Sequence, residues 1–506
     1  MAYNRRMKNA PGMTRRESLQ LMIMGALAAP LAGCATSGAV SSAGRSLADP
    51  LYWSTTRQMA GAVAAGDVSS LELVEACLQR IEAVNTALNA VVKLDADSAL
   101  AQARAADAAR AGGLELGPLH GVPMTIKDSL DTAGMVTTYG TLGRKHFVPD
   151  SDATVVRRLR EAGAILMGKT NTPEFTLDFD TRNLVYGQTR NPHDPSRSPG
   201  GSSGGAGAIV AAGGAPFDIG SDYGGSIRLP AHFNGICGIK PSAGRVPRTG
   251  HAVPFGGFLD NFQVIGPLAR SVDDLTLLLS VIQGPDGIDP GALPLTRGAP
   301  ADVDPAGLRG AWYADNGIAT PTPETQRAVR AAAQALADAG IVMAEARPRG
   351  IERTLEVTLP IYFWDGGAGV ERLLEQAGTT EHTLELFTEA PPVPHEQLVD
   401  ALTRFDSWRS DLLGFVTEYP VIVAPVNAAA AYPAGFETSD EILAKFSYTF
   451  AYNATGWPAV VVPAGRSDQG LPIGVQIIAG PGREDIALAA AGIVERSLSA
   501  YRRPRI

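Results

Sequence analysis

The chain has 506 residues, of which 45% are hydrophobic and 19% are charged, and its formal net charge at pH 7 is −9. A chain of this composition can bury a large core, and its negative balance, without any run of lysine or arginine, argues against a nucleic-acid partner. Three cysteines exclude a disulfide scaffold. Without a Cys-x-x-Cys pair or a histidine cluster, the sequence predicts no metal site, and nothing in it indicates a cofactor.

The first 34 residues have the features of an export signal. Thr14-Arg-Arg-Glu-Ser-Leu19 resembles a twin-arginine motif, and the apolar run over 19–31 is too short to span a bilayer. The run ends in Leu31-Ala-Gly-Cys34, which resembles a lipoprotein cleavage site with Cys34 as the lipid-bearing residue. We expect a signal peptide over 1–34, a flexible tether over 35–46, and a periplasmic or cell-envelope protein that contacts the membrane only through this lipid. A signal that is simply cleaved is the alternative.

Beyond residue 47, predicted helices and strands alternate, which is typical of an α/β protein. Residues 69–86 form an amphipathic pattern that opens with a capping box between Ser69 and Glu72. The other predicted elements are helices over 96–111, 151–162, 207–212, 271–283 and 324–339, strands over 122–127, 164–168 and 475–479, and a terminal helix. No linker interrupts this part of the chain.

Lys127 ends the buried strand predicted over 122–127 and stands beside Asp128. Lysine is rarely fully buried without a partner, and burial lowers the pKa of its amine, which makes it a candidate general base. Considered alone, a snorkelling or salt-bridged lysine is the simpler interpretation. None of the seven histidines has an obvious claim to the role of base.

Two glycine-rich segments each contain a candidate serine: Gly200-Gly-Ser-Ser-Gly-Gly205 and Gly224-Gly-Ser-Ile-Arg228. Dense glycine indicates a tight backbone path that can bring N–H groups close to a developing charge. The first segment also fits the G-x-S-x-G nucleophile elbow, with Ser203 as the nucleophile. That elbow needs a preceding strand, and the three prolines within 191–199 exclude one.

Together these motifs resemble the amidase signature family. Lys127, Ser202 and Ser226 match its lysine and two serines, 75 and then 24 residues apart, and ordered matches extend from about residue 47 to 501. The resemblance implies an α/β fold with a mixed β-sheet core flanked by helices on both faces. It further implies one domain over 47–506, with a variable, substrate-facing region over 285–450.

The resemblance implies an amidase that hydrolyses a carboxylic amide C–N bond through an acyl-serine intermediate. Lys127 would be the base, Ser202 the bridging hydroxyl and Ser226 the nucleophile. The backbone amides expected to bind the oxyanion are those of Tyr223, Gly224, Gly225 and Ser226. The residues expected to support them are Ser203, Asp222 and Arg228, the last two as an ion pair that holds the loop.

Several alternatives stay open from the sequence. The expected partner is a small-molecule linear amide of unknown class. The sequence also leaves open whether esters are substrates and whether the chain forms a homodimer. The chain could instead be the amidase subunit of a tRNA-dependent amidotransferase, or a lipid-anchored solute-binding protein. The export signal argues against the first, and the Lys127–Ser202–Ser226 set against the second. A disulfide between Cys77 and Cys237 has no support in the sequence.

Overall fold

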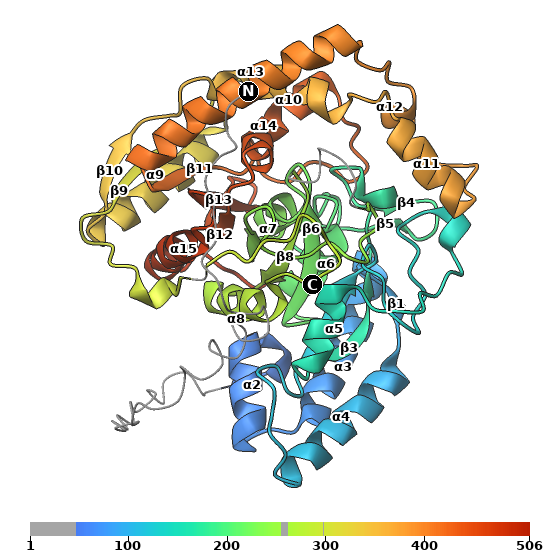
Figure 1. The fold of residues 1–506 in the computed structure, drawn as a ribbon. Helices are drawn as coiled ribbons and strands as arrows, with labels where there is room; N and C mark the ends of the chain where they lie inside the picture. The colour runs from blue at the N-terminus through green and yellow to red at the C-terminus, as the bar shows by residue number, and fades with distance from the viewer. Residues whose placement is uncertain (1–46, 255–261, 297) are drawn as a thin grey trace, which may run out of the picture. The chain divides into compact units, whose positions relative to one another are not determined.

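An 11-stranded mixed β-sheet forms the core of the computed structural model, which describes residues 47–254, 262–296 and 298–506 (Figure 1). The strands are β1 (Val91–Leu94), β2 (Pro123–Lys127), β3 (Ile165–Thr170), β6 (Phe217–Asp222), β7 (Cys237–Lys240), β8 (Val264–Ala269), β9 (Arg309–Trp312), β10 (Val342–Glu345), β11 (Val421–Pro425), β12 (Ala459–Arg466) and β13 (Pro472–Ala479). Their order is β1-β3-β2-β6-β8-β7-β12-β13-β11-β9-β10. β2 is parallel to both of its neighbours, β3 and β6, whereas the run from β6 to β11 is antiparallel throughout. A separate small sheet pairs β4 (Arg182–Asn183) with β5 (Gly187–Gln188).

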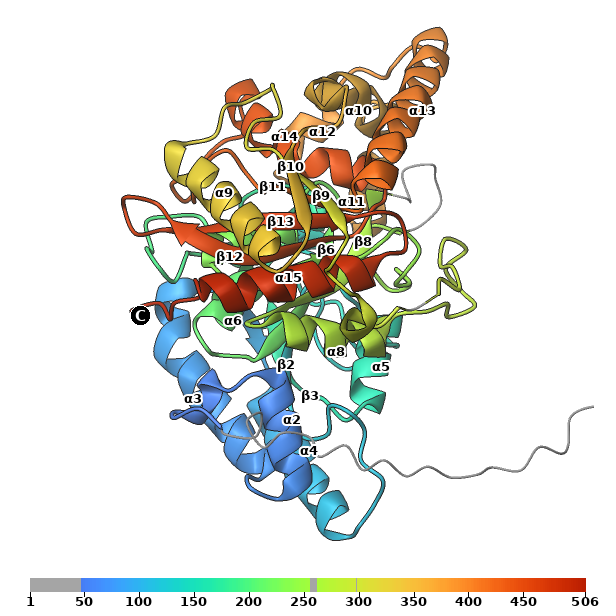
Figure 2. The ribbon, with the colours of Figure 1, turned by 90° about the vertical axis from the view of Figure 1, so that its left-hand side faces the viewer.

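Helices cover both faces of this sheet. They are α2 (Thr56–Ala65), α3 (Ser70–Leu88), α4 (Ala96–Ala111), α5 (Thr154–Glu161), α6 (Gly204–Ala211), α7 (Arg228–Asn234), α8 (Val272–Ile282), α9 (Pro323–Asp338), α10 (Thr354–Tyr362), α11 (Ala368–Ala377), α12 (Glu385–Thr388), α13 (His395–Glu418), α14 (Asp440–Ala454) and α15 (Glu484–Leu498). Both α7 and α15 pack on β12 and β13 but make no extensive contact with each other, so they lie on opposite faces. α6 packs beside α7, and α8 and α9 pack beside α15 (Figure 2). The predicted fold class, an α/β fold with a mixed sheet and flanking helices, is confirmed.

Local sequence signals explain where several elements begin and end. The predicted capping box is present, because the Ser69 side chain accepts from the Glu72 amide at 3.1 Å and Glu72 accepts in return from the Ser69 amide at 2.8 Å. α4 ends at Ala111 with Gly112 as its C-cap, where the sequence predicts the end of the helix. The strand predicted over 122–127 is β2, whose residues are all buried. The helix predicted over 207–212 begins earlier, at Gly204, directly after the first serine pair.

The region over 285–450 extends the sheet and carries a group of helices. β9, β10 and β11 pair in parallel at the sheet's edge, and α10 packs against α13 and α14. Figure 1 shows α10 to α13, in yellow and orange, along the upper side of the view. Among the described residues no helix is long and apolar enough to cross a membrane. The signal peptide and tether expected over 1–46 lie outside the described residues.

Cys77 and Cys237 are both buried free thiols, so the structure contains no disulfide between them. Burial raises the pKa of the Cys77 thiol to about 12, and that of Cys237 is raised well above its usual value, mainly by burial. Both cysteines therefore act as small core residues.

Candidate active site

Lys127 lies at the carboxyl end of β2, in the middle of the parallel part of the sheet, with no solvent exposure. Its Nζ lies 2.6 Å from Ser202 Oγ and 3.0 Å from Ser221 Oγ. Burial lowers the pKa of the amine well below its usual value, although the nearby carboxylates of Asp222 and Asp218 oppose that shift. A lysine with a lowered pKa, hydrogen-bonded to a serine, can serve as a general base.

Ser202 sits in a loop that closely approaches other backbone segments. The Gly201–Ser202 peptide bond is cis. A Cβ atom on Gly201 would lie 2.7 Å from the Asp180 carbonyl oxygen, and one on Gly205 would lie 2.4 Å from the Asn171 nitrogen. A larger residue at Gly201 would push this loop, and with it Ser202, away from the backbone of 178–180, and one at Gly205 would push the start of α6 away from Asn171, the residue after β3. The glycine density of the segment is thus explained by close backbone contacts.

Ser226 lies on the turn between β6 and α7 and borders a cavity of about 170 Å³. The preceding residue, Gly225, has φ of 132°, and a Cβ there would lie 2.6 Å from Thr449 Oγ1. Both features require glycine. The Ser203 amide donates to the Ser226 carbonyl at 3.2 Å, which ties the two serine loops together. The sequence predicts a supporting role for Ser203. Its hydroxyl also donates to the Ser221 carbonyl at 3.3 Å, so Ser203 contacts both β6 and the turn after it.

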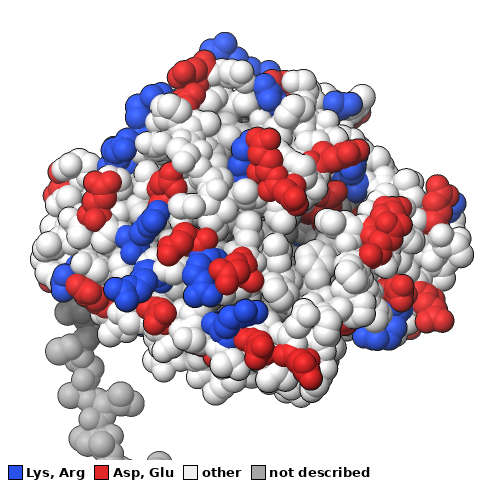
Figure 3. Space-filling view, turned by 90° about the horizontal axis from the view of Figure 1, so that it is seen from above, with Lys and Arg blue, Asp and Glu red and all other residues white. Residues whose placement is uncertain are grey.

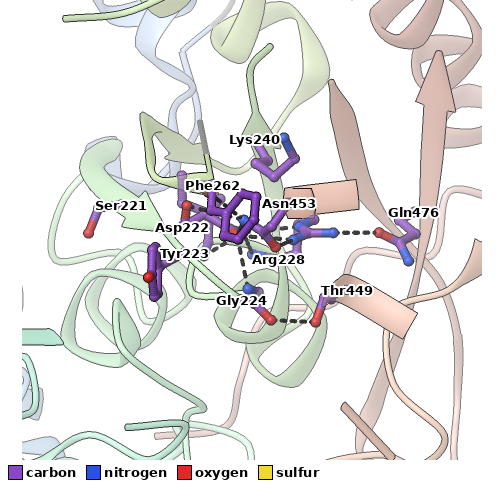
Figure 4. Close-up of polar contacts among 12 residues, drawn as sticks. Ser221, Asp222, Tyr223, Gly224, Arg228, Lys240, Phe262, Thr449, Asn453 and Gln476 are labelled. Carbon is purple, nitrogen blue, oxygen red and sulfur yellow. Dashed lines mark hydrogen bonds and ion pairs between the residues drawn. The ribbon is translucent and has the colours of Figure 1, made fainter. Parts of the chain in front are cut away.

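Asp222 and Arg228 form a buried ion pair that spans the Ser226 turn (Figure 4). Asp222 accepts from the guanidinium through both carboxylate oxygens at 3.0 Å, and from the Ile227 amide at 3.1 Å. Arg228 also donates to Gln476 on β13 at 3.0 Å and to Asn453 on α14. Burial acts to raise the pKa of Asp222, but Arg228 together with Lys240 and Asn453 outweighs it, so the net pKa is lowered. The turn is therefore anchored to two distant elements.

The backbone amides expected to bind an oxyanion are not equivalent. The Gly225 N–H donates to Asp222 Oδ1 at 2.9 Å, so it already holds the turn together. The amides of Gly224 and Ser226 donate to no other group in the part of the chain that the structure describes. The Tyr223 carbonyl accepts from the Tyr362 hydroxyl at 2.7 Å, which fixes the peptide leading into Gly224. Gly224 and Ser226 are thus the amides best able to take a new acceptor.

The cavity beside Ser226 has mostly aromatic and aliphatic walls. Its aromatic side chains come from five separate regions of the chain, and Tyr362 contacts both Tyr223 and Phe450 edge-on, with ring centroids 5.0 and 5.2 Å apart. Two carboxylates, Asp178 and Asp440, border the cavity, and no described lining residue is Lys, Arg or His. Burial, and then the nearby Asp180, raise the pKa of Asp178 to about 6.

Two polar residues of the site were missed by the sequence reasoning. Ser221 bonds to Lys127, and His251 Nε2 lies 2.9 Å from Ser221 Oγ. Ser221 directly precedes Asp222 on β6, so its place on that strand is the signal that could have found it. His251 lies in the segment between β7 and β8, and no local pattern links it to Lys127. Within 47–254, 262–296 and 298–506, no group of three His, Cys, Asp or Glu side chains is placed to hold a metal ion.

Comparison with known proteins identifies the family. The family profile "Amidase" matches residues 72–488. An acylamidase from Rhodococcus erythropolis is 35% identical over 468 residues, covering 88% of this chain and 95% of the relative. A glutamyl-tRNA(Gln) amidotransferase subunit from Chloroflexus aurantiacus is 36% identical over 496 residues, covering 90% and 99%. The solved structure of a 6-aminohexanoate cyclic dimer hydrolase complexed with substrate is similar with a TM-score of 0.79 and 30% identity, covering 90% and 99%. The chain therefore belongs to the amidase signature family of hydrolases.

Proposed function

We propose that the chain hydrolyses linear carboxylic amides through an acyl-serine intermediate on Ser226. The observation that carries the proposal is the 2.6 Å contact between Lys127 Nζ and Ser202 Oγ in a fully buried setting. A serine hydroxyl becomes an effective nucleophile only when a base takes its proton. Lys127, whose pKa is lowered, is hydrogen-bonded to Ser202, and in the proposed relay Ser202 passes on the proton of Ser226.

The proposed reaction begins with neutral Lys127. It takes the hydroxyl proton of Ser202 as Ser202 takes that of Ser226, and Ser226 Oγ forms a bond to the carbonyl carbon. The carbonyl oxygen becomes an oxyanion, which the amides of Gly224 and Ser226 bind; losing one such donor typically costs about 2.7–4 kcal/mol. The C–N bond then breaks, the relay returns the proton to the leaving amine, and water hydrolyses the acyl-serine.

The surroundings of Lys127 must make its neutral form accessible. With an ordinary pKa near 10.4, about one lysine in 2,500 would be neutral at pH 7. This corresponds to roughly 4.6 kcal/mol in favour of the ammonium. Burial of Lys127 acts against the ammonium, since the charged form is poorly solvated in the interior. The environment of β2 thus supports the role of base.

The cavity supports an uncharged, apolar acyl group. Apolar side chains form most of its wall, so an aromatic or branched aliphatic group gains by leaving water. The two carboxylates, Asp178 and Asp440, disfavour a substrate that brings a carboxylate of its own. An anionic acyl group would find no cation among the described lining residues.

The amidase subunit of an amidotransferase is the second candidate, because one relative with that name is 36% identical over nearly its whole length. An amino-acid amide donor would bring an α-carboxylate into a cavity that has no described counter-ion. A tRNA partner favours a basic surface, whereas Figure 3 shows acidic and basic side chains interspersed on the face it presents. The net charge of −9 also opposes it. These features favour the hydrolase.

We also propose that the enzyme is exported and held at the cell envelope by lipid on Cys34. The support is the ordered sequence of Arg15-Arg16, an apolar run and Leu31-Ala-Gly-Cys34. An exported amidase would act on amides outside the cytoplasm, which is incompatible with charging tRNA.

The proposed reaction is tested by covalent labelling combined with a substrate panel. A serine-reactive phosphonate should add to Ser226, as located by peptide mass spectrometry, and Ser226→Ala should lose both the label and all turnover. A label on Ser203 would contradict the assignment of the nucleophile. The panel should contain open-chain primary amides, anilides and a cyclic amide. Turnover of the cyclic amide alone would contradict the linear substrate.

A further inference from the structure

Ser221 Oγ lies between two buried nitrogen groups. Lys127 Nζ is 3.0 Å away on one side and His251 Nε2 is 2.9 Å away on the other. His251 is only 5% exposed, and the neighbouring Ala252 amide donates to the Ser129 carbonyl at 2.8 Å, which fixes this segment against the residues after β2. The imidazole is therefore linked to the lysine through the Ser221 hydroxyl.

The hydrogen bonds of His251 determine which ring nitrogen carries the proton. The Val253 backbone amide donates to Nδ1 at 3.2 Å, and the Gln263 side-chain amide is directed at the same atom. A backbone N–H can only donate, so Nδ1 is the acceptor and neutral imidazole carries its proton on Nε2. The Nε2–H group consequently donates to Ser221 Oγ.

We propose that His251 is a positioning residue that, through Ser221, keeps the lone pair of the Lys127 amine directed at Ser202. This inference rests on the proposed function, in which neutral Lys127 is the base. A neutral amine has two N–H groups and one lone pair. His251 donates to one lone pair of Ser221 Oγ, and the other lone pair receives an N–H of Lys127. The amine's own lone pair then faces the Ser202 hydroxyl, whose proton it must take.

The charged groups near Lys127 make the neutral N–H donor of His251 important. On β6, Asp218 and Asp222 both favour the ammonium form of Lys127. Burial, then Lys127 and also Arg248, lower the pKa of His251 to about 3, so its ring is neutral over the range in which amidases can be assayed. The partial positive charge of its N–H group opposes a cation on Lys127. Removing the N–H group of His251 should therefore make the ammonium form of Lys127 more favourable.

The test is the pH dependence of kcat/KM for an open-chain amide in matched variants. His251→Phe retains most of the volume but has no N–H donor. We expect the acidic limb of its pH profile to move up by about one pH unit, so that kcat/KM at pH values below the limb falls at least about tenfold. His251→Gln, which keeps an N–H donor, should restore the limb toward that of the wild type. A merely structural role would lower the plateau without moving the limb.

Controls separate this inference from the proposed function and from misfolding. His120→Phe alters a histidine whose ring contacts the Ala106 carbonyl, and it should leave the limb unchanged. Ser221→Ala should move the limb by itself, and adding His251→Phe should move it no further, because the two residues act as one unit. If His251→Phe does not fold, His251→Leu, which also has no N–H donor, takes its place in both comparisons. An unchanged limb in every foldable variant would overturn the role of His251, whereas a wild type without amide turnover would overturn the proposed function.

Discussion

Asp222 and Arg228 form a fully buried ion pair around the turn that carries Ser226, with Arg228 Nη2 3.0 Å from Asp222 Oδ1. The carboxylate also binds amides of the turn, and the guanidinium reaches α14 and β13. Because desolvating two charges offsets much of their attraction, such a pair contributes less to stability than its geometry suggests. Its evident role is to hold the backbone of the turn in one conformation.

Removal of the guanidinium should be strongly destabilising. Arg228→Met leaves the Asp222 carboxylate buried without its cation, and we expect a loss of about 3–5 kcal/mol in the free energy of unfolding. Thermal unfolding followed by circular dichroism measures this. The matched control is Arg353→Met, which breaks the exposed 2.9 Å pair with Glu356 and should lower the free energy of unfolding far less. Equal shifts in the two variants would show that the buried pair has no special role.

Lys127→Ala and Ser202→Ala should each remove most amide turnover, and the double variant should be barely slower than either one. Residues that pass one proton along act as a unit, so their effects do not multiply. Single-turnover rates with an activated amide would measure this. Ser280→Ala, on α8, changes a serine whose hydroxyl donates to the Leu277 carbonyl of the same helix, and it should not alter the rate. Fully multiplicative losses would place Lys127 and Ser202 in separate steps.

Much of the fold could be predicted because its signals are local. The capping box at Ser69, the glycine that ends α4 and the apolar run of β2 each depend on a few consecutive residues. The pairing of β9 with β11, in contrast, joins strands about a hundred residues apart, and no local pattern specifies such a partner. The order of the strands in the sheet could therefore not be predicted from the sequence.

The same distinction applies to the site. Lys127, Ser202 and Ser226 stand in dense motifs, so their identity could be predicted. His251 reaches the site through contacts with residues remote in sequence, including Ser221 and the backbone of Leu130. The aromatic walls of the cavity come from segments that show no spacing rule relative to Ser226. A histidine that supports a lysine through a serine has no sequence signature.

Substrate preference should depend on charge and on pH. We expect kcat/KM for 4-methylpentanamide to exceed that for succinamate, of similar shape, by at least about 30-fold at pH 8, or about 2 kcal/mol. Burial raises the pKa of Asp178 to about 6. Below that pH the carboxyl becomes neutral and repels the anionic substrate less, so the ratio should fall as the pH is lowered from 8 to 5.5. Competition between the two amides measures the ratio and cancels the titration of Lys127.

Two variants test the origin of this preference. Asp178→Asn should lower the ratio and remove its pH dependence, since no titrating group then remains at that position. Asp440→Asn, on the exposed rim, should lower the ratio but leave the pH dependence in place. A ratio near one in the wild type would contradict the proposed apolar acyl group.

The N-terminal sequence predicts that the mature enzyme begins at Cys34 and is lipid-anchored outside the cytoplasm. Replacing Arg15 and Arg16 with Lys should leave the enzyme inside the cell, because twin-arginine export depends on that pair. The chain offers a matched control in Arg5 and Arg6, whose replacement with Lys should not affect export. Cys34→Ser should release the exported enzyme from the membrane, since the lipid would have no attachment site. Fractionation and N-terminal mass spectrometry measure these outcomes. Recovery of the intact N-terminus from the cytoplasm would contradict export and would favour the amidotransferase alternative, because the export signal is a principal argument against it.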